Sequence, residues 1–290
     1  MRPVNAPAWL VARPIAHRGL HGKASGVIEN TLRAAEAAIA GGYAIECDVR
    51  ISKDGEAFVF HDETLDRLTD ATGPFCALSA AAIAKVRIRG ADEPPPAFAA
   101  FLAAVGGRTP VICELKSAFD GDWRIADGVA ALAADYDGPL AFKSFDHDLV
   151  AYLRLRRPHV RSRATCPIGI VAQASYDGPD WACLGAEQKR DWADFDHFDL
   201  VRPDFLSWNV DDLPHKIPFL VKQLTGAPVM AWTVRTREQR EAALKWADQI
   251  VFEGDPGSDP LSPDGTQVTS RFPDSSTGTL RASPPRRSPA

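Results

Sequence analysis

Short apolar runs alternate with segments of helical periodicity along most of the chain. Eight apolar runs of strand type are bounded by turn residues: 15–16, 43–49, 111–115, 140–145, 161–166, 205–210, 229–234 and 250–252. Between them, apolar residues recur at helical spacing over 31–40, 97–105, 125–134, 148–155, 217–224 and 237–246. This alternation favours an α/β fold of the TIM-type (β/α)8 barrel class, with a doubly wound open sheet as the weaker alternative.

One further strand is predicted outside this alternation. Residues 57–60 follow Asp54-Gly55, a dipeptide that favours a tight hairpin turn because glycine tolerates positive φ. The strand should therefore fold back on the arm formed by 46–51. Residues 62–96 then form a small insertion after the second strand, which we expect near the active face.

The apolar pattern stops at about residue 255. Seven of the 23 prolines fall in the last 36 residues, together with many Gly, Ser and Thr. Such a composition buries too little apolar surface to fold. We therefore expect a barrel over 1–254 and a disordered tail over 255–290.

Composition and charge narrow the choice of partners and compartment. The chain is 45% hydrophobic and 24% charged, as globular proteins are, and its net charge of −5 argues against a nucleic-acid partner. The five cysteines contain no close pair, the N-terminal segment is broken by prolines, and no run approaches the length of a transmembrane helix. These features predict a cytoplasmic protein with no transmembrane segment that acts on a small molecule.

The first predicted strand ends in residues suited to catalysis. His17, Arg18 and Gly19 supply an imidazole, a permanent cation and a flexible backbone point. Active sites of α/β barrels lie at the carboxyl ends of the strands. Taken alone, however, a histidine beside a glycine turn is more often a structural residue.

The second strand carries two carboxylates on one face. Side chains alternate along a strand, so Glu46 and Asp48 point the same way. Facing the barrel mouth, they would be costly unless paired or bound to a metal, and their oxygens suit a hard cation such as Mg²⁺ or Ca²⁺. A salt bridge with Arg18 or Arg50 is the alternative.

The third strand and the hairpin add to this group. Glu114 and Lys116 share a face of the third strand, although they could also be a simple ion pair. The hairpin arm ends in His61-Asp62, and its turn brings His61 back beside the carboxylates. Two histidines would then flank a carboxylate-bound metal.

These residue types together match the needs of phosphodiester hydrolysis. A metal, arginine and lysine neutralise charge on the phosphoryl group. Histidine can take or give a proton near neutral pH, and arginine can offer two parallel hydrogen bonds to phosphate oxygens. It is the co-occurrence of these groups that favours catalysis over isolated structural roles.

The chain also resembles the glycerophosphodiester phosphodiesterase family over residues 15 to about 254. The matching segments are His17-Arg18-Gly19, Glu29-Asn30-Thr31, Glu46-x-Asp48, His61-Asp62-x-x-Leu65-x-Arg67-x-Thr69, Glu114-x-Lys116, Ser144-Phe145 and Trp232-Thr233-Val234. The resemblance implies metal-dependent hydrolysis of a glycerophosphodiester to glycerol 3-phosphate and an alcohol. Lysophospholipids or other phosphodiesters are alternative substrates, and a non-catalytic phosphometabolite-binding barrel is a weaker alternative.

The same resemblance implies roles for individual residues. It makes His17 and His61 the acid/base pair, in either order, and makes Arg18 and Lys116 phosphate contacts. The metal ligands it implies are Glu46, Asp48 and Glu114, and the supporting residues are Glu29 and Asn30.

Some positions depart from the family pattern or allow two interpretations. Arg235 stands where asparagine is frequent, and the last strand ends in Phe252-Glu253 where Thr-Asp is common, which bears on alcohol and glycerol specificity. Trp232 is either a platform for the glycerol moiety or part of the core. His147 and His197 are expected to be solvated or capping residues.

Overall fold

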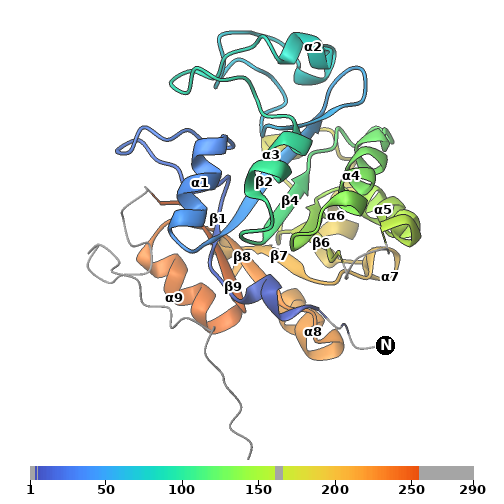
Figure 1. Cartoon of the computed structure of the whole chain (residues 1–290). Coiled ribbons are helices and arrows are strands. Elements are labelled where there is room, and N and C mark those ends of the chain that lie inside the picture. The colour runs from blue at the N-terminus through green and yellow to red at the C-terminus, as the bar shows by residue number, and fades with distance from the viewer. Residues whose placement is uncertain (1–3, 5, 161–165, 255–290) are drawn as a thin grey trace, which may run out of the picture.

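The structure, a computed structural model, describes residues 4, 6–160 and 166–254. Eight parallel strands form a closed barrel, because β1 pairs with β2 on one side and with β9 on the other (Figure 1). The barrel strands are β1 (Ile15–Ala16), β2 (Ala44–Ile51), β4 (Val111–Leu115), β5 (Leu140–Ser144), β6 (Ile168–Ala172), β7 (Leu206–Asn209), β8 (Val229–Val234) and β9 (Gln249–Phe252). The predicted TIM-type barrel is thereby confirmed, and the open sheet is excluded.

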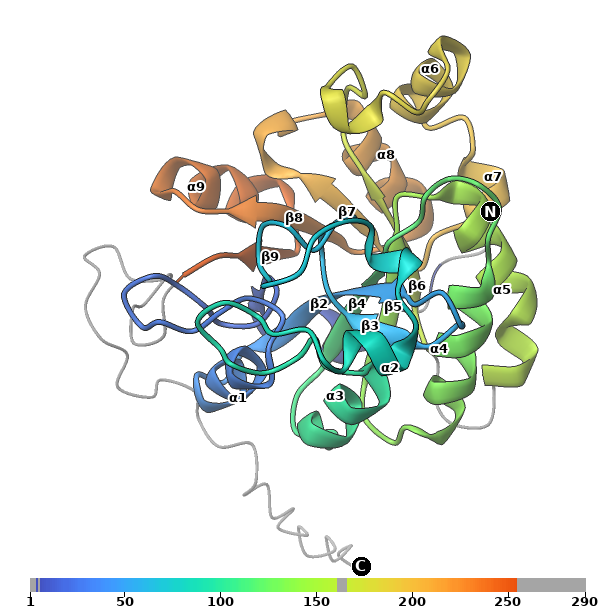
Figure 2. The same ribbon diagram turned by 90° about the horizontal axis from the view of Figure 1, so that it is seen from above.

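Helices surround the strands, as the view from above shows (Figure 2). The helices that follow the barrel strands are α1 (Leu32–Ala40), α3 (Phe98–Val105), α4 (Arg124–Asp135), α5 (His147–Val160), α6 (Ala186–Asp194), α7 (Phe198–Val201), α8 (Lys216–Thr225) and α9 (Arg237–Trp246). Thr31 caps α1, and Thr236 forms a capping box with Gln239 at α9, so polar side chains satisfy the first backbone N–H groups. No helix in the described part of the chain combines the length and apolar character that crossing a membrane requires.

The predicted hairpin and insertion are present. Strand β3 (Ala57–Val59) pairs antiparallel with β2, with Val49 opposite Val59. The chain then continues through η2 (Phe75–Ala77) and α2 (Ala80–Ile83), which lies at the top of Figure 1. Phe60 stacks on Phe75 within a small apolar core of this segment. This small core fixes the end of the hairpin, where His61 follows Phe60.

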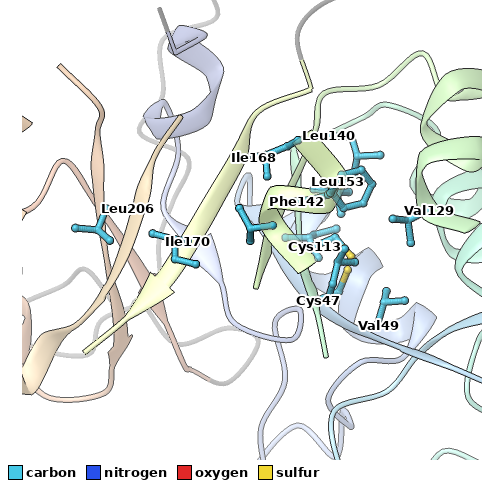
Figure 3. Close-up of a cluster of buried hydrophobic side chains, with 14 of the residues drawn as sticks. Cys47, Val49, Cys113, Val129, Leu140, Phe142, Leu153, Ile168, Ile170 and Leu206 are labelled. Atoms are coloured by element: carbon cyan, nitrogen blue, oxygen red, sulfur yellow. The ribbon is translucent and has the colours of Figure 1, made fainter. Parts of the chain in front are cut away.

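The main core lies between the barrel strands and the helices. Alternate residues of neighbouring strands, such as Cys47, Cys113 and Phe142, meet Val129 of α4 and Leu153 of α5 there (Figure 3). All five are buried. Replacing Phe142 by alanine would destabilise the fold by about 3–5 kcal/mol, because the transfer and cavity costs add.

A second apolar layer closes the base of the barrel interior. It consists of Leu10 from η1 (Ala8–Val11), Phe205 just before β7, and inward-facing strand residues: Ile15, Ala44, Ile112, Ala141, Met230 and Val251. Gly169 makes room for this layer, since a Cβ atom there would lie 2.5 Å from the Phe205 ring. This layer closes the barrel at the amino ends of the strands, so the interior is open only at their carboxyl ends.

The sixth strand differs from its prediction. The apolar pattern predicts it at 161–166, but residues 161–165 lie outside the described residues and Cys166 is not in a strand. The strand is β6, whose run of apolar residues pairs with β5 and β7. A strand buried on both faces needs such a run. The predicted disordered tail, residues 255–290, also lies outside the described residues.

Candidate active site

Three carboxylates meet at the carboxyl ends of β2 and β4. Asp48 pairs with Glu114 in the strand register, and Glu46 lies one inward position below Asp48. One oxygen from each of the three lies within 4.8 Å of the others, and all three side chains are buried. The strand alternation read from the sequence thus brings together the residues it selected.

Cations and an amide surround Asp48. Lys116 Nζ lies 2.9 Å from Asp48 Oδ1 and forms a second ion pair with Glu114, while Arg18 Nε lies 3.4 Å from Asp48 Oδ2. Asn30 Nδ2 donates to Asp48 Oδ2 at 2.9 Å. Burial alone would raise the pKa of the Asp48 carboxyl, but Lys116 and its cationic neighbours outweigh burial and hold that pKa well below its usual range. Asp48 is therefore a carboxylate at neutral pH.

Gly19 explains the local shape of the His-Arg-Gly turn. Its φ is +76°, and a Cβ atom there would lie 2.7 Å from the Ala34 side chain. Arg18 also has positive φ, and its backbone N–H donates to Glu46 Oε2 at 3.1 Å. The turn therefore packs tightly on α1 and directs its backbone toward the carboxylates.

A further cation, Lys143 on β5, was not selected from the sequence. Its side chain is 3% exposed, and its Nζ lies 3.0 Å from Glu46 Oε1 and 3.5 Å from Glu114 Oε2. Burial would lower the pKa of Lys143, but these carboxylates raise it above its usual value. The signal was available, because alternation from the inward Ala141 places Lys143 inside the barrel.

The donor set fits a hard divalent cation. Glu46, Asp48 and Glu114 offer three carboxylate oxygens from a buried site, and such oxygens are the ligands that Mg²⁺ and Ca²⁺ prefer. The ammonium of Lys143 occupies one side of this cluster. It therefore belongs to the charge balance of the site.

His17 is oriented by residues that lie close to the other end of the chain, after β8 and β9. Its Nδ1 is 2.7 Å from Glu253 Oε1, and Arg235 donates to both oxygens of Glu253, at 2.7 and 2.8 Å. His17 Nε2 lies 4.0 Å from Glu46 Oε2. With Nδ1 donating to Glu253, Nε2 is the atom that faces the carboxylate cluster. The two departures from the family pattern, Arg235 and Glu253, thus contact each other, and Glu253 also contacts the predicted catalytic histidine.

His61 has the same arrangement, built from residues close in sequence. Its Nδ1 is 2.8 Å from Asp62 Oδ1, and Arg67 donates to both Asp62 oxygens, at 2.6 and 2.8 Å. Arg67 also pairs with Glu29, which accepts a 2.7 Å hydrogen bond from Arg18. Glu29 therefore links the His61 side of the site to the His17 side.

A cavity of about 620 Å³ opens beside the charged residues, and His17, Arg18, His61 and Lys116 line one half of it. Aromatic residues line the other half. Phe145 packs against Trp181 at a centroid distance of 4.8 Å and edge-on against Trp232 at 5.5 Å. Phe119 completes the row at 6.2 Å from Trp181. Trp232 is half-buried, because it lines the cavity and also packs against the apolar layer at the base of the barrel. We call Phe119, Phe145, Trp181 and Trp232 the aromatic wall.

The expectation for two other histidines is wrong. His147 and His197 stack on each other with ring centroids 3.3 Å apart, and His147 also contacts Trp192. His147 is 3% exposed. Burial lowers the pKa of His147 to about 2 and that of His197 to about 4. His147 is a neutral buried residue and His197 a neutral half-buried one that makes no side-chain capping bond to α7. The helices α6 and α7 beside them were not predicted.

Comparison with known proteins identifies the family. The model of the glycerophosphoryl diester phosphodiesterase family matches residues 17–257. The chain belongs to this family. A curated family member, the glycerophosphodiester phosphodiesterase of Caldanaerobacter subterraneus subsp. tengcongensis, is 26% identical over 254 residues, covering 83% of this chain and 93% of that protein. Human glycerophosphodiester phosphodiesterase 1 is 42% identical over 73 residues, which are 25% of this chain and 21% of that protein.

Solved structures agree with this assignment at the level of the fold. A phosphodiesterase from Oleispira antarctica, in complex with the product sn-glycerol 3-phosphate, matches with a TM-score of 0.67 at 20% identity, covering 85% of this chain and 94% of that one. Membership in the family makes the chain a phosphodiesterase, and it confirms the resemblance found in the sequence.

Proposed function

We propose that the protein hydrolyses glycerophosphodiesters to sn-glycerol 3-phosphate and an alcohol with the help of a divalent cation. In the net reaction, the P–O bond to the alcohol breaks, the alcohol oxygen takes a proton, and phosphorus gains an oxygen that derives from water. Family membership supports the substrate class. The observation that carries the metal is the buried group of Glu46, Asp48 and Glu114.

The charged residues of the site would have the following roles. The three carboxylates hold Mg²⁺ or Ca²⁺, which when bound polarises the phosphoryl group. Arg18 and Lys116 bind the phosphate oxygens.

The two histidines would carry the protons. With Nδ1 of each held by a carboxylate, Nε2 of His17 and of His61 are left for the reaction. One removes a proton from the attacking oxygen, and the other protonates the leaving alkoxide. Glu29 holds Arg18 and Arg67 in place, and Asn30 holds Asp48.

Several broader assignments belong to the same proposal. Residues 1–254 form the catalytic barrel, and the enzyme acts in lipid metabolism in the cytoplasm. The free cysteines suit a reducing compartment. The net charge of −5 favours a small-molecule substrate over a nucleic acid.

A substrate panel with controlled cation tests the proposal. The panel contains glycerophosphodiesters with choline, ethanolamine and glycerol head groups, a lysophospholipid and bis(p-nitrophenyl) phosphate, each with Mg²⁺, Ca²⁺ or excess chelator. Phosphorus NMR identifies the products. We expect sn-glycerol 3-phosphate from the glycerophosphodiesters only when a cation is present. Faster hydrolysis of the lysophospholipid would transfer the assignment to that substrate class, and full turnover in chelator would exclude the metal.

A further inference from the structure

The cavity is divided into two halves of different chemistry. The half beside the carboxylates, which we call the charged half, carries His17 and His61. It also carries Arg18, Arg50 and Lys116, which suit an anionic phosphate. The half formed after β4 to β8 carries the aromatic wall. Phe119 lies three residues after Lys116, and Phe145 lies two residues after Lys143, so the two halves adjoin.

The aromatic wall packs against apolar clusters on one side and lines the cavity on the other. All four side chains are half-buried, and each lines the cavity. Their ring centroids follow one another at 4.8 to 6.2 Å. The negative faces of aromatic rings attract cations within about 6 Å, and tryptophan does so most strongly.

Two aspartates and one paired arginine are the charged residues that we place beside the wall. Asp180 precedes Trp181, and Asp211 lies two residues after Asn209, which is in register with Trp232. Both aspartates are exposed and line the cavity. Arg235 also lines this side, but Glu253 balances its charge through two hydrogen bonds. This half of the cavity therefore has an acidic rim around an aromatic surface.

We infer that the leaving alcohol of the preferred substrate carries a quaternary ammonium group, which binds against the aromatic wall beside Asp180 and Asp211. The inference rests on the proposed function, because the alcohol is defined by the diester that is hydrolysed. A neutral alcohol or an acyl chain would gain from the rings but not from the aspartates. An anionic head group would be repelled by them.

Two diesters of the same shape, one with a charged and one with a neutral alcohol, test the inference together with variants of the wall. sn-Glycero-3-phosphocholine is compared with the 3,3-dimethylbutyl diester, in which a carbon atom replaces the quaternary nitrogen. We expect kcat/KM to be at least about tenfold higher for the choline diester, the ratio that about 1.4 kcal/mol of cation binding produces. Trp181→Leu and Asp211→Asn should each reduce this ratio several-fold, whereas Trp123→Leu, at a tryptophan outside the cavity, should preserve it.

The outcomes separate the inference from the function on which it rests. A ratio near or below one in the parent enzyme would overturn the inference and indicate an apolar occupant. A ratio that survives in both Trp181→Leu and Asp211→Asn would also overturn it. Absence of turnover on both diesters with cation present would overturn the proposed function itself. The parent ratio depends on no variant, so a variant that fails to fold leaves the main test intact.

Discussion

The two halves of the cavity differ in how the chain builds them. The charged half uses side chains at the ends of β1, β2 and β4, fixed by strand alternation and by close pairs such as Glu46 and Asp48. The aromatic wall combines loop residues with the ends of β5 and β8. Residues on regular strands therefore form most of the charged half, whereas the aromatic wall depends on how distant loops pack.

The largest effect is expected from the two histidines of the charged half. His17→Ala and His61→Ala should each lower kcat by about 10²–10⁴, because each removes a proton-transfer group. Steady-state kinetics on a glycerophosphodiester measure the loss, with circular dichroism to confirm the fold. His215→Asn, which can still cap α8, is the matched control. Parent-like rates in either alanine variant would show that this histidine does not take part in proton transfer.

The carboxylates that orient the histidines should have the next largest effect. Glu253→Gln and Asp62→Asn should each lower kcat by about ten- to a hundredfold, because each histidine loses the carboxylate that fixes its orientation and stabilises its charged form. Glu241→Gln, an exposed glutamate paired with Arg237, serves as the control. An effect on KM alone would show that these groups bind substrate instead.

Lys143 should affect the cation more than the fold. Lys143→Met removes a positive charge that lies 3.0 Å from Glu46, so the cation should bind about tenfold more tightly. Calorimetric titration with Mg²⁺ and Ca²⁺ measures the change, and Lys222→Met is a surface control. Weaker binding in Lys143→Met would mean that the lysine positions the ligands rather than competing with the cation.

The smallest effect concerns the histidine stack behind the aromatic wall. The folded-state pKa values of His147 and His197, about 2 and about 4, lie below the value of about 6.5 for an unfolded histidine. As pH falls below about 6.5, these histidines take up protons in the unfolded chain but not in the folded one. The free energy of unfolding is therefore highest above pH 6.5 and decreases until the folded-state pKa values are reached. Between pH 7 and 5 each histidine should cost on the order of 1 kcal/mol in the free energy of unfolding.

Chemical denaturation at several pH values measures this loss. The double variant His147→Phe with His197→Phe keeps stacked rings that cannot be protonated, so its stability should depend less steeply on pH between 7 and 5. A double variant that loses stability as steeply as the parent would assign the pH dependence to other groups.

The sequence predicts the barrel and the charged half well because both depend on local patterns. Period-two alternation identifies the strands and places Glu46, Asp48, Glu114 and Lys116, and the same rule extends to Lys143. It does not identify partners far apart in the chain. The His17–Glu253 contact joins residues 236 positions apart, which meet only because the barrel closes.

The aromatic half is harder to predict for a different reason. Phe119 lies in the loop after β4, and Trp181 ends the three-residue 3-10 helix η3 (Pro179–Trp181) after β6. Neither segment is long enough for a periodicity that indicates which way a side chain points. Their neighbours α6 and α7 are short, and the sixth strand was placed several residues too early. Local sequence patterns therefore do not predict the aromatic wall, whose residues come together only through tertiary packing.

The most direct test of the central claim follows cation binding and turnover on one preparation. Cation-stripped protein is titrated with Mg²⁺ or Ca²⁺ in a calorimeter, and the hydrolysis of sn-glycero-3-phosphocholine is measured at the same free cation concentrations. We predict that the rate rises in proportion to the bound cation, that excess chelator abolishes it, and that Asp48→Asn loses both binding and rate while the surface variant Asp194→Asn keeps both. Full turnover in chelator, or cation binding that persists in Asp48→Asn, would contradict a metal site formed by Glu46, Asp48 and Glu114.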